Sequence, residues 1–108
     1  MDTYEKILAI MGKLDNDQER DACRTAERIL FNAVAIRVHQ VTAEDFINTL
    51  DGKPVKKEKL DLTEAMEAQK TIHQFGERFD IDIPIIEDED EFLYWLMRDY
   101  GLSTLMHT

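Results

Sequence analysis

Apolar residues recur at helical spacing along most of this chain. In one segment Ala65, Ala68, Ile72, Phe75 and Phe79 follow one another at steps of three or four residues, which places them on one face of a helix. The same pattern predicts five helices, over residues 2–14, 17–40, 42–51, 61–79 and 87–101. We therefore expect an all-α protein that folds as a compact five-helix bundle.

Capping patterns and helix breakers set the predicted ends. Asp2 with Glu5 forms a capping-box pattern before the first helix, and Gly101 stands where a helix C-terminus favours glycine. The stretch "DIDIPII" alternates as a strand does, but Pro84 and the lack of a partner strand favour an extended connector. The last helix contains "FLYWLM", which is apolar on all sides. This helix is therefore either central in the bundle or packed against a second copy of the chain.

The second predicted helix is the longest, and its apolar residues form one stripe. Its second half, "ILFNAVAIRV", is predicted to be buried on most sides. The stripe consists of Ala22, Ala26, Ile29, Ala33 and Ile36, widened by Cys23, Leu30 and Val34. The apolar surplus on this segment and on the last helix predicts a homodimer.

Charge and composition narrow the function. The 108 residues fit one domain, residues 1–108, and carry 23 acidic against 13 basic residues, a formal net charge of −10. An excess of acids repels phosphate backbones, so we expect no direct nucleic-acid binding. The basic stretch "KPVKKEK" has no interleaved aromatic residue for base stacking, and we interpret it as a solvated loop or a docking patch for an acidic partner. One cysteine excludes an intramolecular disulfide, and no stretch is long enough to span a membrane, so we expect a cytoplasmic protein.

The acid run "EDEDE" at residues 87–91 precedes the last helix. Acidic side chains stabilise a helix N-terminus because the dipole there is positive. A calcium loop would need alternating ligands and a central glycine, and a di-metal bundle would need Glu-x-x-His pairs. Since neither pattern is present, we interpret the run as a helix start and expect no metal site and no cofactor.

Few residues are candidates for chemistry. The chain has four glycines and contains no phosphate-binding loop, nucleophile elbow or zinc-protease motif, so we expect no enzymatic activity. His107 lies in a tail that is expected to fray, His73 is interpreted as a packing residue, and Cys23 as a small core residue. His39 ends the second predicted helix, where the helix dipole raises the pKa of a histidine. An ordinary boundary histidine is the competing interpretation.

The segment "FGERFDIDIPIIEDEDEFLYWLM" resembles the end of a PTS regulation domain (PRD), a module of bacterial antiterminators and activators. The positions that fill the family pattern are Phe75, Phe79, Ile83, Pro84, Asp88, Glu89, Phe92 and Leu93. The resemblance extends over about residues 15–105 and implies a five-helix, homodimeric module. It also implies structural roles for Pro84, Asp88, Glu89 and Phe92, with the two acids holding the preceding connector in place.

Two histidines of the resembled family receive phosphate from PTS phosphocarriers. Carried over, the first falls near His39, which becomes the candidate phospho-acceptor, and the second position is occupied by Leu96. Two extra residues, "II", separate Pro84 from the acids, and the arginine that often follows the first histidine is replaced by the "INTL" region. The resemblance therefore implies a stand-alone, partly degenerate PRD without a nucleic-acid-binding domain.

Three functions are compatible with these patterns. The first is a regulatory binding module that engages a PTS phosphocarrier or a transcription regulator, with or without phosphate transfer to His39. The second is an adaptor or structural dimer on the same fold, in which histidine chemistry has been lost. The third is a small enzyme with a carboxylate-based site, for which the sequence offers no constellation.

Overall fold

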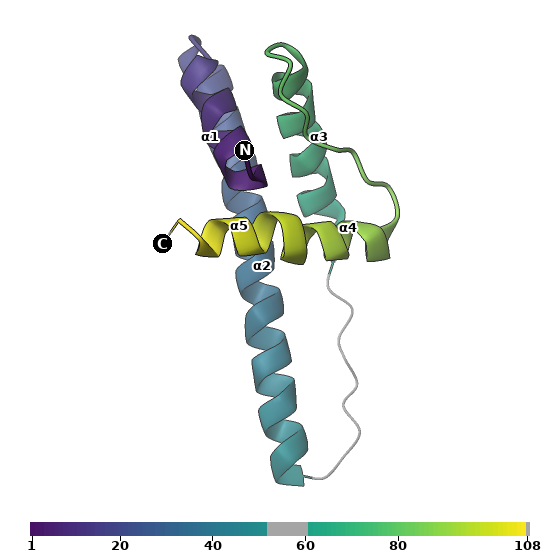
Figure 1. The fold of residues 1–108 in the computed structure, drawn as a ribbon. Coiled ribbons are helices and arrows are strands. Elements are labelled where there is room, and N and C mark those ends of the chain that lie inside the picture. The colour runs from purple at the N-terminus through teal and green to yellow at the C-terminus, as the bar shows by residue number, and fades with distance from the viewer. Residues whose placement is uncertain (52–60, 108) are drawn as a thin grey trace.

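The structure, a computed structural model, describes residues 1–51 and 61–107, and it describes side chains for residues 1–38 and 61–107. These residues form four helices and no strand (Figure 1). The helices are α1 (Thr3–Lys13), α2 (Asp17–Asp51), α3 (Thr63–Glu77) and a C-terminal helix composed of α4 (Glu89–Trp95), a π-helical turn (Leu96–Gly101) and α5 (Leu102–Leu105). The predicted all-α class is confirmed.

Three helices lie side by side and the fourth crosses them (Figure 1). α1, the first half of α2 and α3 pack against one another, and the C-terminal helix runs across them. Beyond this crossing α2 continues past the other helices, and the chain measures 54 × 28 × 22 Å. Its Cα radius of gyration of 15.7 Å exceeds the value of about 13 Å that a globule of this length has, as the protruding helix requires.

The predicted third helix is not separate, because α2 runs without interruption from Asp17 to Asp51. The pattern of Thr42 and Asp45 resembles a capping box, but no glycine or proline lies between Gly12 and Gly52 to end a helix there. The residues that the structure describes therefore form four helices, where the sequence predicted five. Among the described residues, every helix falls short of the combined length and apolar character that crossing a membrane requires.

The C-terminal helix continues to Leu105, whereas the sequence predicted that it ends at Gly101. Gly101 keeps helical angles, with φ −61° and ψ −49°. A Cβ atom at this position would lie 3.5 Å from Cγ1 of Val34 on α2. Gly101 therefore lies inside the C-terminal helix, beside Val34 of α2, and not at a helix end.

The π-helical turn keeps four buried side chains on one face. Phe92, Leu96, Tyr100 and Thr104 follow at four-residue steps, and all are buried. In an α-helix each such step rotates the side chain by roughly 40° beyond a full turn, so three steps would carry Thr104 away from the core. The wider turn between Leu96 and Gly101 removes part of this rotation.

The connector between α3 and α4, residues 81–88, has no regular structure, as predicted. Asp80 has a φ of 55°, and this left-handed residue reverses the chain after α3. The backbone N–H of Ile81 then donates to the carbonyl of Gly76 at 3.0 Å. Ile81 and Ile83 are buried, so the connector forms part of the core.

The core confirms the stripe on α3, since Ala65, Ala68 and Ile72 are buried and both phenylalanines pack against them. The stripe predicted on α2 is only partly correct. Ala22 is exposed and Ile36 is 49% exposed, whereas Cys23 and Leu30 are fully buried. The core-facing side of α2 is therefore rotated relative to the predicted one.

Candidate functional site

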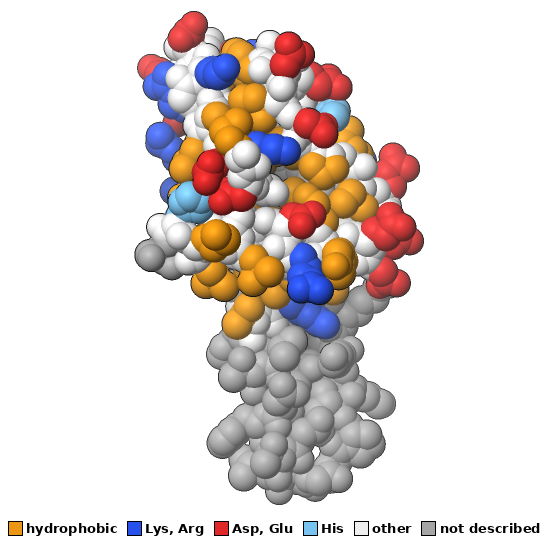
Figure 2. Space-filling view, in the orientation of Figure 1, with side chains coloured by type: hydrophobic (Ala, Val, Ile, Leu, Met, Phe, Trp, Pro, Cys, Tyr) orange, Lys and Arg blue, Asp and Glu red, His pale blue; other side chains and the backbone are white. Residues whose placement is uncertain are grey.

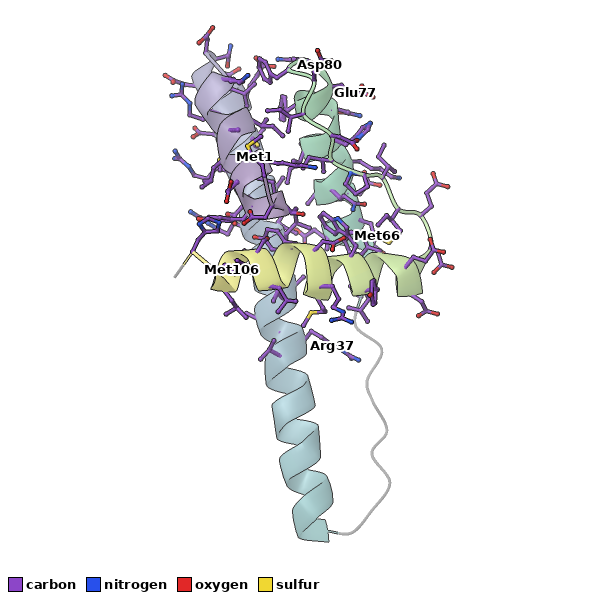
Figure 3. All side chains as sticks on the ribbon, viewed as in Figure 1. Met1, Arg37, Met66, Glu77, Asp80 and Met106 are labelled. Carbon is purple, nitrogen blue, oxygen red and sulfur yellow. The ribbon has the colours of Figure 1, made fainter. Side chains whose placement is uncertain are left out.

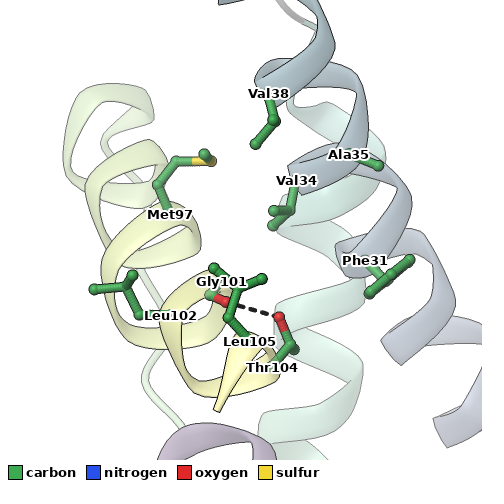
Figure 4. A pocket seen from close by; sticks show the side chains of 9 residues that line it. All are labelled: Phe31, Val34, Ala35, Val38, Met97, Gly101, Leu102, Thr104 and Leu105. Atoms are coloured by element: carbon green, nitrogen blue, oxygen red, sulfur yellow. Dashed lines mark hydrogen bonds between the residues drawn. The ribbon is translucent and has the colours of Figure 1, made fainter. Parts of the chain in front are cut away.

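An apolar groove lies between α2 and the C-terminal helix (Figure 4). Its volume is about 570 Å³. The lining residues come from two turns of α2 and from the π-helical turn and α5; they are Phe31, Val34, Ala35, Val38, Met97, Gly101, Leu102, Thr104 and Leu105. We call this feature the apolar groove.

Small residues and a helix crossing produce the apolar groove. Gly101 brings the C-terminal helix close to Val34, and the two helices diverge on either side of this contact. Phe31 is 50% exposed, Val38 50% and Leu105 66%. "ILFNAVAIRV" was predicted to be buried on most sides, and this prediction is wrong for Phe31 and Val38, which lie on the groove side of α2.

The floor of the apolar groove offers no free hydroxyl group. The Oγ1 atom of Thr104 donates to the carbonyl of Gly101 at 2.7 Å, inside its own helix (Figure 4). The other lining side chains are hydrocarbon or thioether. Such a surface contributes to binding by burying apolar area and provides neither a proton donor nor a nucleophile.

One carboxylate near the groove is already engaged. The hydroxyl of the buried Tyr100 donates to Oε1 of Glu27 at 2.6 Å, which joins the C-terminal helix to α2. Burial, followed by the hydrogen bond to Glu27, raises the pKa of Tyr100 well above its usual range. The pair is therefore a structural bond between the groove's two walls.

A second cluster joins the two ends of the chain. Nε2 of His107 lies 3.0 Å from Oδ2 of Asp2 and 3.5 Å from Oε1 of Glu5, and its ring lies 5.0 Å from that of Tyr4. His107 was expected in a fraying tail; this expectation is wrong, because the side chain is held at α1. Oδ1 of Asp2 accepts from the backbone N–H of Glu5 at 2.8 Å, and this bond is the first cause of the lowered pKa of Asp2.

This terminal cluster has the donor types of a divalent-cation site, with one ligand atom each from two carboxylates and one imidazole within 4.8 Å of one another. Its existing bonds explain it without a ligand. Asp2 caps α1, as its sequence pattern predicted, and His107 completes an ion pair when protonated. We assign it the role of a clamp between the chain ends.

His73 connects α3 to the connector. Its Nδ1 bonds the carbonyl oxygen of Ile83, and its Nε2 lies 2.9 Å from Oε1 of Glu77. The bond to Ile83 is the main reason why the pKa of His73 is raised, since the protonated ring donates from both nitrogens. His73 is partly buried, as predicted, and its role is to hold the connector.

Cys23 is fully buried in the core, as predicted. Burial raises the pKa of its thiol to about 11, so that the thiolate, the nucleophilic form, is absent near neutral pH. This residue is therefore a packing residue.

Asp88, Glu89 and Phe92 of the family pattern lie at the end of the C-terminal helix that is far from the groove. Asp88 is the N-cap of α4 and accepts from the N–H of Glu91 at 2.9 Å, and Glu89 is the first residue of that helix. Phe92 is fully buried, and Pro84 lies in the connector. The prediction that the acid run starts a helix is confirmed.

Side chains from α1 and α3 hold the connector, and the role expected of Asp88 and Glu89 there stays a prediction. Besides His73, Oε1 of Gln69 accepts from the N–H of Ile86 at 2.9 Å, and Nζ of Lys6 donates to the carbonyl of Asp82 at 3.2 Å. The described bond of Asp88 stays within its own helix. Sequence reasoning missed Gln69, because a polar residue in an otherwise apolar stripe carries no local sign of its acceptor role.

The side chain of His39 lies outside the described residues, but its place on the backbone is known. His39 was expected at a helix C-terminus, and α2 instead continues to Asp51. The dipole argument for a raised pKa at His39 therefore no longer applies. The apolar groove was also not predicted from the sequence, although Met97, Gly101 and Leu105, at four-residue steps, indicate a helix that continues past Gly101.

No family model, no curated protein and no solved structure matches this chain.

Proposed function

We propose that this protein is a small helical binding module that captures one helix of another protein in the apolar groove. The observation that carries the proposal is the exposure of Phe31, Val38 and Leu105 around a hollow between two helices. A concave apolar surface between two helices is a common form of binding site. An amphipathic helix fits such a groove with residues at steps of three and four.

Leaving the apolar surface of the groove exposed to water is unfavourable in free energy. Each square ångström of apolar surface that a partner covers contributes roughly 25 cal/mol before the entropy of association is subtracted. The groove is formed by helix positions that the core already fixes, Val34 and Gly101 among them. Little ordering is thus required of this protein when the partner binds.

Site-specific photo-crosslinking tests the proposal. A photoreactive phenylalanine analogue at position 105 is expected to give a discrete protein adduct in cells that naturally express the chain, and the same analogue at position 8 is not. Leu8 is a suitable control because it is an apolar side chain, 44% exposed, on α1 and away from the groove.

Binding of the crosslinked protein is then measured with purified components. Leu105→Asp should weaken its affinity at least about tenfold, since a desolvated carboxylate in an apolar site is costly, and Leu8→Asp should leave it unchanged. Equal effects of the two substitutions, or the absence of any adduct specific to position 105, would overturn the proposal.

The resemblance to PTS regulation domains gives a second candidate, a module of the same kind that also receives a phosphoryl group. It is supported by the family pattern around the start of the C-terminal helix, where Asp88 caps α4 and Phe92 is buried. The phosphoryl group would pass from a phosphohistidine of the phosphocarrier to a ring nitrogen of His39. Incubation with phosphoenolpyruvate, enzyme I and HPr, read as the gain in intact mass of the wild type and of His39→Ala, tests this candidate; the same gain in both proteins, or no gain in either, would refute it.

The predicted homodimer stays a prediction. A second copy of the chain is one conceivable occupant of the apolar groove, and sedimentation of the protein with and without Leu105→Asp measures it directly.

A further inference from the structure

Three arginines border the apolar groove. Arg28 lies with Phe31 and Thr104 in a hollow that adjoins one end of the groove. Arg37 immediately precedes Val38 on α2, and Figure 3 places it just beyond the C-terminal helix. Arg98 follows Met97 on the opposite wall, with its guanidinium 5.4 Å from the ring centre of Tyr94. We call Arg28, Arg37 and Arg98 the arginine rim.

The arginine rim is not neutralised by the described part of the chain. None of the ion pairs formed among the described residues includes Arg28, Arg37 or Arg98. The nearby carboxylate of Glu27 is engaged by the hydroxyl of Tyr100. An arginine side chain holds a carboxylate with two parallel hydrogen bonds, so these positions are suited to acidic partners.

The local charge is opposite to that of the whole molecule. The chain carries a formal net charge of −10, and its acid run at residues 87–91 lies at the other end of the C-terminal helix. Figure 2 shows blue side chains beside apolar ones at the lower edge of the described surface, whereas red side chains lie at the right edge, at the top and in the middle of this face. Selection of a partner by charge at the groove therefore has a physical basis.

We infer that the helix bound by the apolar groove is acidic along the edges of its apolar face. This inference rests on the proposed function, because it names the chemistry of the partner in the same groove. The apolar face supplies the contact area, and carboxylates of the partner pair with Arg28, Arg37 and Arg98. Exposed ion pairs are individually weak, so their main effect is on the choice of partner and on the rate of association.

A second copy of the chain fits this groove less well. In a symmetric dimer that pairs the two grooves across the twofold axis, the arginine rim of one copy would approach the arginine rim of the other. Glu27, which lies with Arg28 in the adjoining hollow, already accepts a hydrogen bond from Tyr100. Like charges brought together at an interface oppose association, and we therefore favour a different, acidic partner.

A displayed library of amphipathic helices tests the inference. The library varies the apolar face among apolar residues and the flanking positions among Glu, Lys, Gln and Ser, and it is selected on the full chain and in parallel on Leu105→Asp. We expect the peptides enriched on the wild-type protein to carry net acidic flanks. The affinity of the best peptide should fall when the salt concentration rises from 50 to 300 mM, because exposed ion pairs are screened.

Matched variants separate the rim from the overall charge. Arg28→Gln, Arg37→Gln and Arg98→Gln combined should weaken the best peptide about tenfold, as the loss of three exposed ion pairs predicts. Lys6→Gln, Lys13→Gln and Lys70→Gln combined change the net charge equally, away from the groove, and should weaken it less than about twofold. The thermal unfolding midpoint of each variant verifies that it is folded.

The failures of the two proposals are distinguishable. Enrichment of neutral or basic flanks, or equal losses in the two triple variants, would overturn the acidic partner while the groove remains a binding site. No enrichment beyond that on Leu105→Asp would overturn the proposed function itself. Concentration-dependent self-association that Leu105→Asp abolishes would assign the groove to a second copy and refute the acidic partner.

Discussion

Replacing Gly76 by alanine should destabilise the protein, although alanine is the better helix former. A Cβ atom at position 76 would lie 2.5 Å from the carbonyl oxygen of Ile81 and 3.2 Å from Cδ1 of Ile10. The first distance is about 0.8 Å shorter than the ~3.3 Å at which a carbon and an oxygen normally meet. The oxygen belongs to the backbone of Ile81, and the N–H of Ile81 donates to the carbonyl of Gly76. The connector therefore cannot move freely away from position 76.

The expected magnitude follows from two opposing terms. Overpacking a core costs typically 1–3 kcal/mol, and a rigid backbone contact places this position near about 3 kcal/mol. The higher helix propensity of alanine returns about 1 kcal/mol. We therefore expect Gly76→Ala to lower the free energy of unfolding by about 2 kcal/mol, measured by urea denaturation followed by circular dichroism at 222 nm.

Gly12→Ala is the matched control. Gly12 lies in α1, and a Cβ atom there would meet no atom within 4 Å. The same substitution should therefore raise the free energy of unfolding, by up to about 1 kcal/mol. If Gly76→Ala is as stabilising as Gly12→Ala, the close approach of the connector to α3 is refuted.

Three further perturbations test the core. Gln69→Ala should destabilise by about 1–2 kcal/mol. The N–H of Ile86 loses its acceptor and a cavity opens in the core, but removal of the buried Nε2 atom, which has no hydrogen-bond partner among the described residues, offsets part of this loss. Urea denaturation measures the change, and an unchanged free energy of unfolding would contradict the buried bond. Tyr100→Phe should lower the free energy of unfolding by about 1–2 kcal/mol through the lost bond to Glu27, and an unchanged midpoint would argue against that bond. Burial raises the pKa of Cys23 to about 11, above the value of about 8.5 in the unfolded chain. The stability gained by keeping the thiol neutral is therefore complete below about pH 8.5 and is lost as the pH rises toward 11. The thermal unfolding midpoint should fall across this range, and it should fall less steeply in Cys23→Ala. A pH dependence identical in the two proteins would refute the contribution of Cys23.

The terminal cluster of Asp2, Glu5 and His107 holds the C-terminal end of the chain, and this end forms one wall of the apolar groove. His107 contacts Asp2 and Glu5, and the backbone N–H of Tyr4 donates to Oγ of the buried Ser103 at 3.2 Å. These bonds fix α5 against α1, and α5 contributes Leu102 and Leu105 to the groove. The contacts of His107 and the hydrogen bond to Ser103 therefore support the wall of the apolar groove that α5 forms.

Features that depend on neighbouring residues were predictable. The spacing on α3, the cap provided by Asp2 and the helix start at Asp88 are local, because each arises from residues within one or two turns. Features were not predictable where the local pattern of residues fits a different structure equally well. Thr42 and Asp45 resemble a helix start even inside the long helix α2, and Gly101 resembles a helix end while packing against Val34.

The sequence by itself determined the helical class, most helix starts, the buried stripe of α3 and the buried position of Cys23, because local propensity and the periodicity of apolar residues decide these. Only the tertiary structure decided which side of α2 faces the core, that the chain ends meet at Asp2 and His107, and that an apolar groove lies beside Arg28, Arg37 and Arg98. Each of these depends on how one helix lies across another, and contacts between residues as distant as Asp2 and His107 leave no periodic trace in the chain.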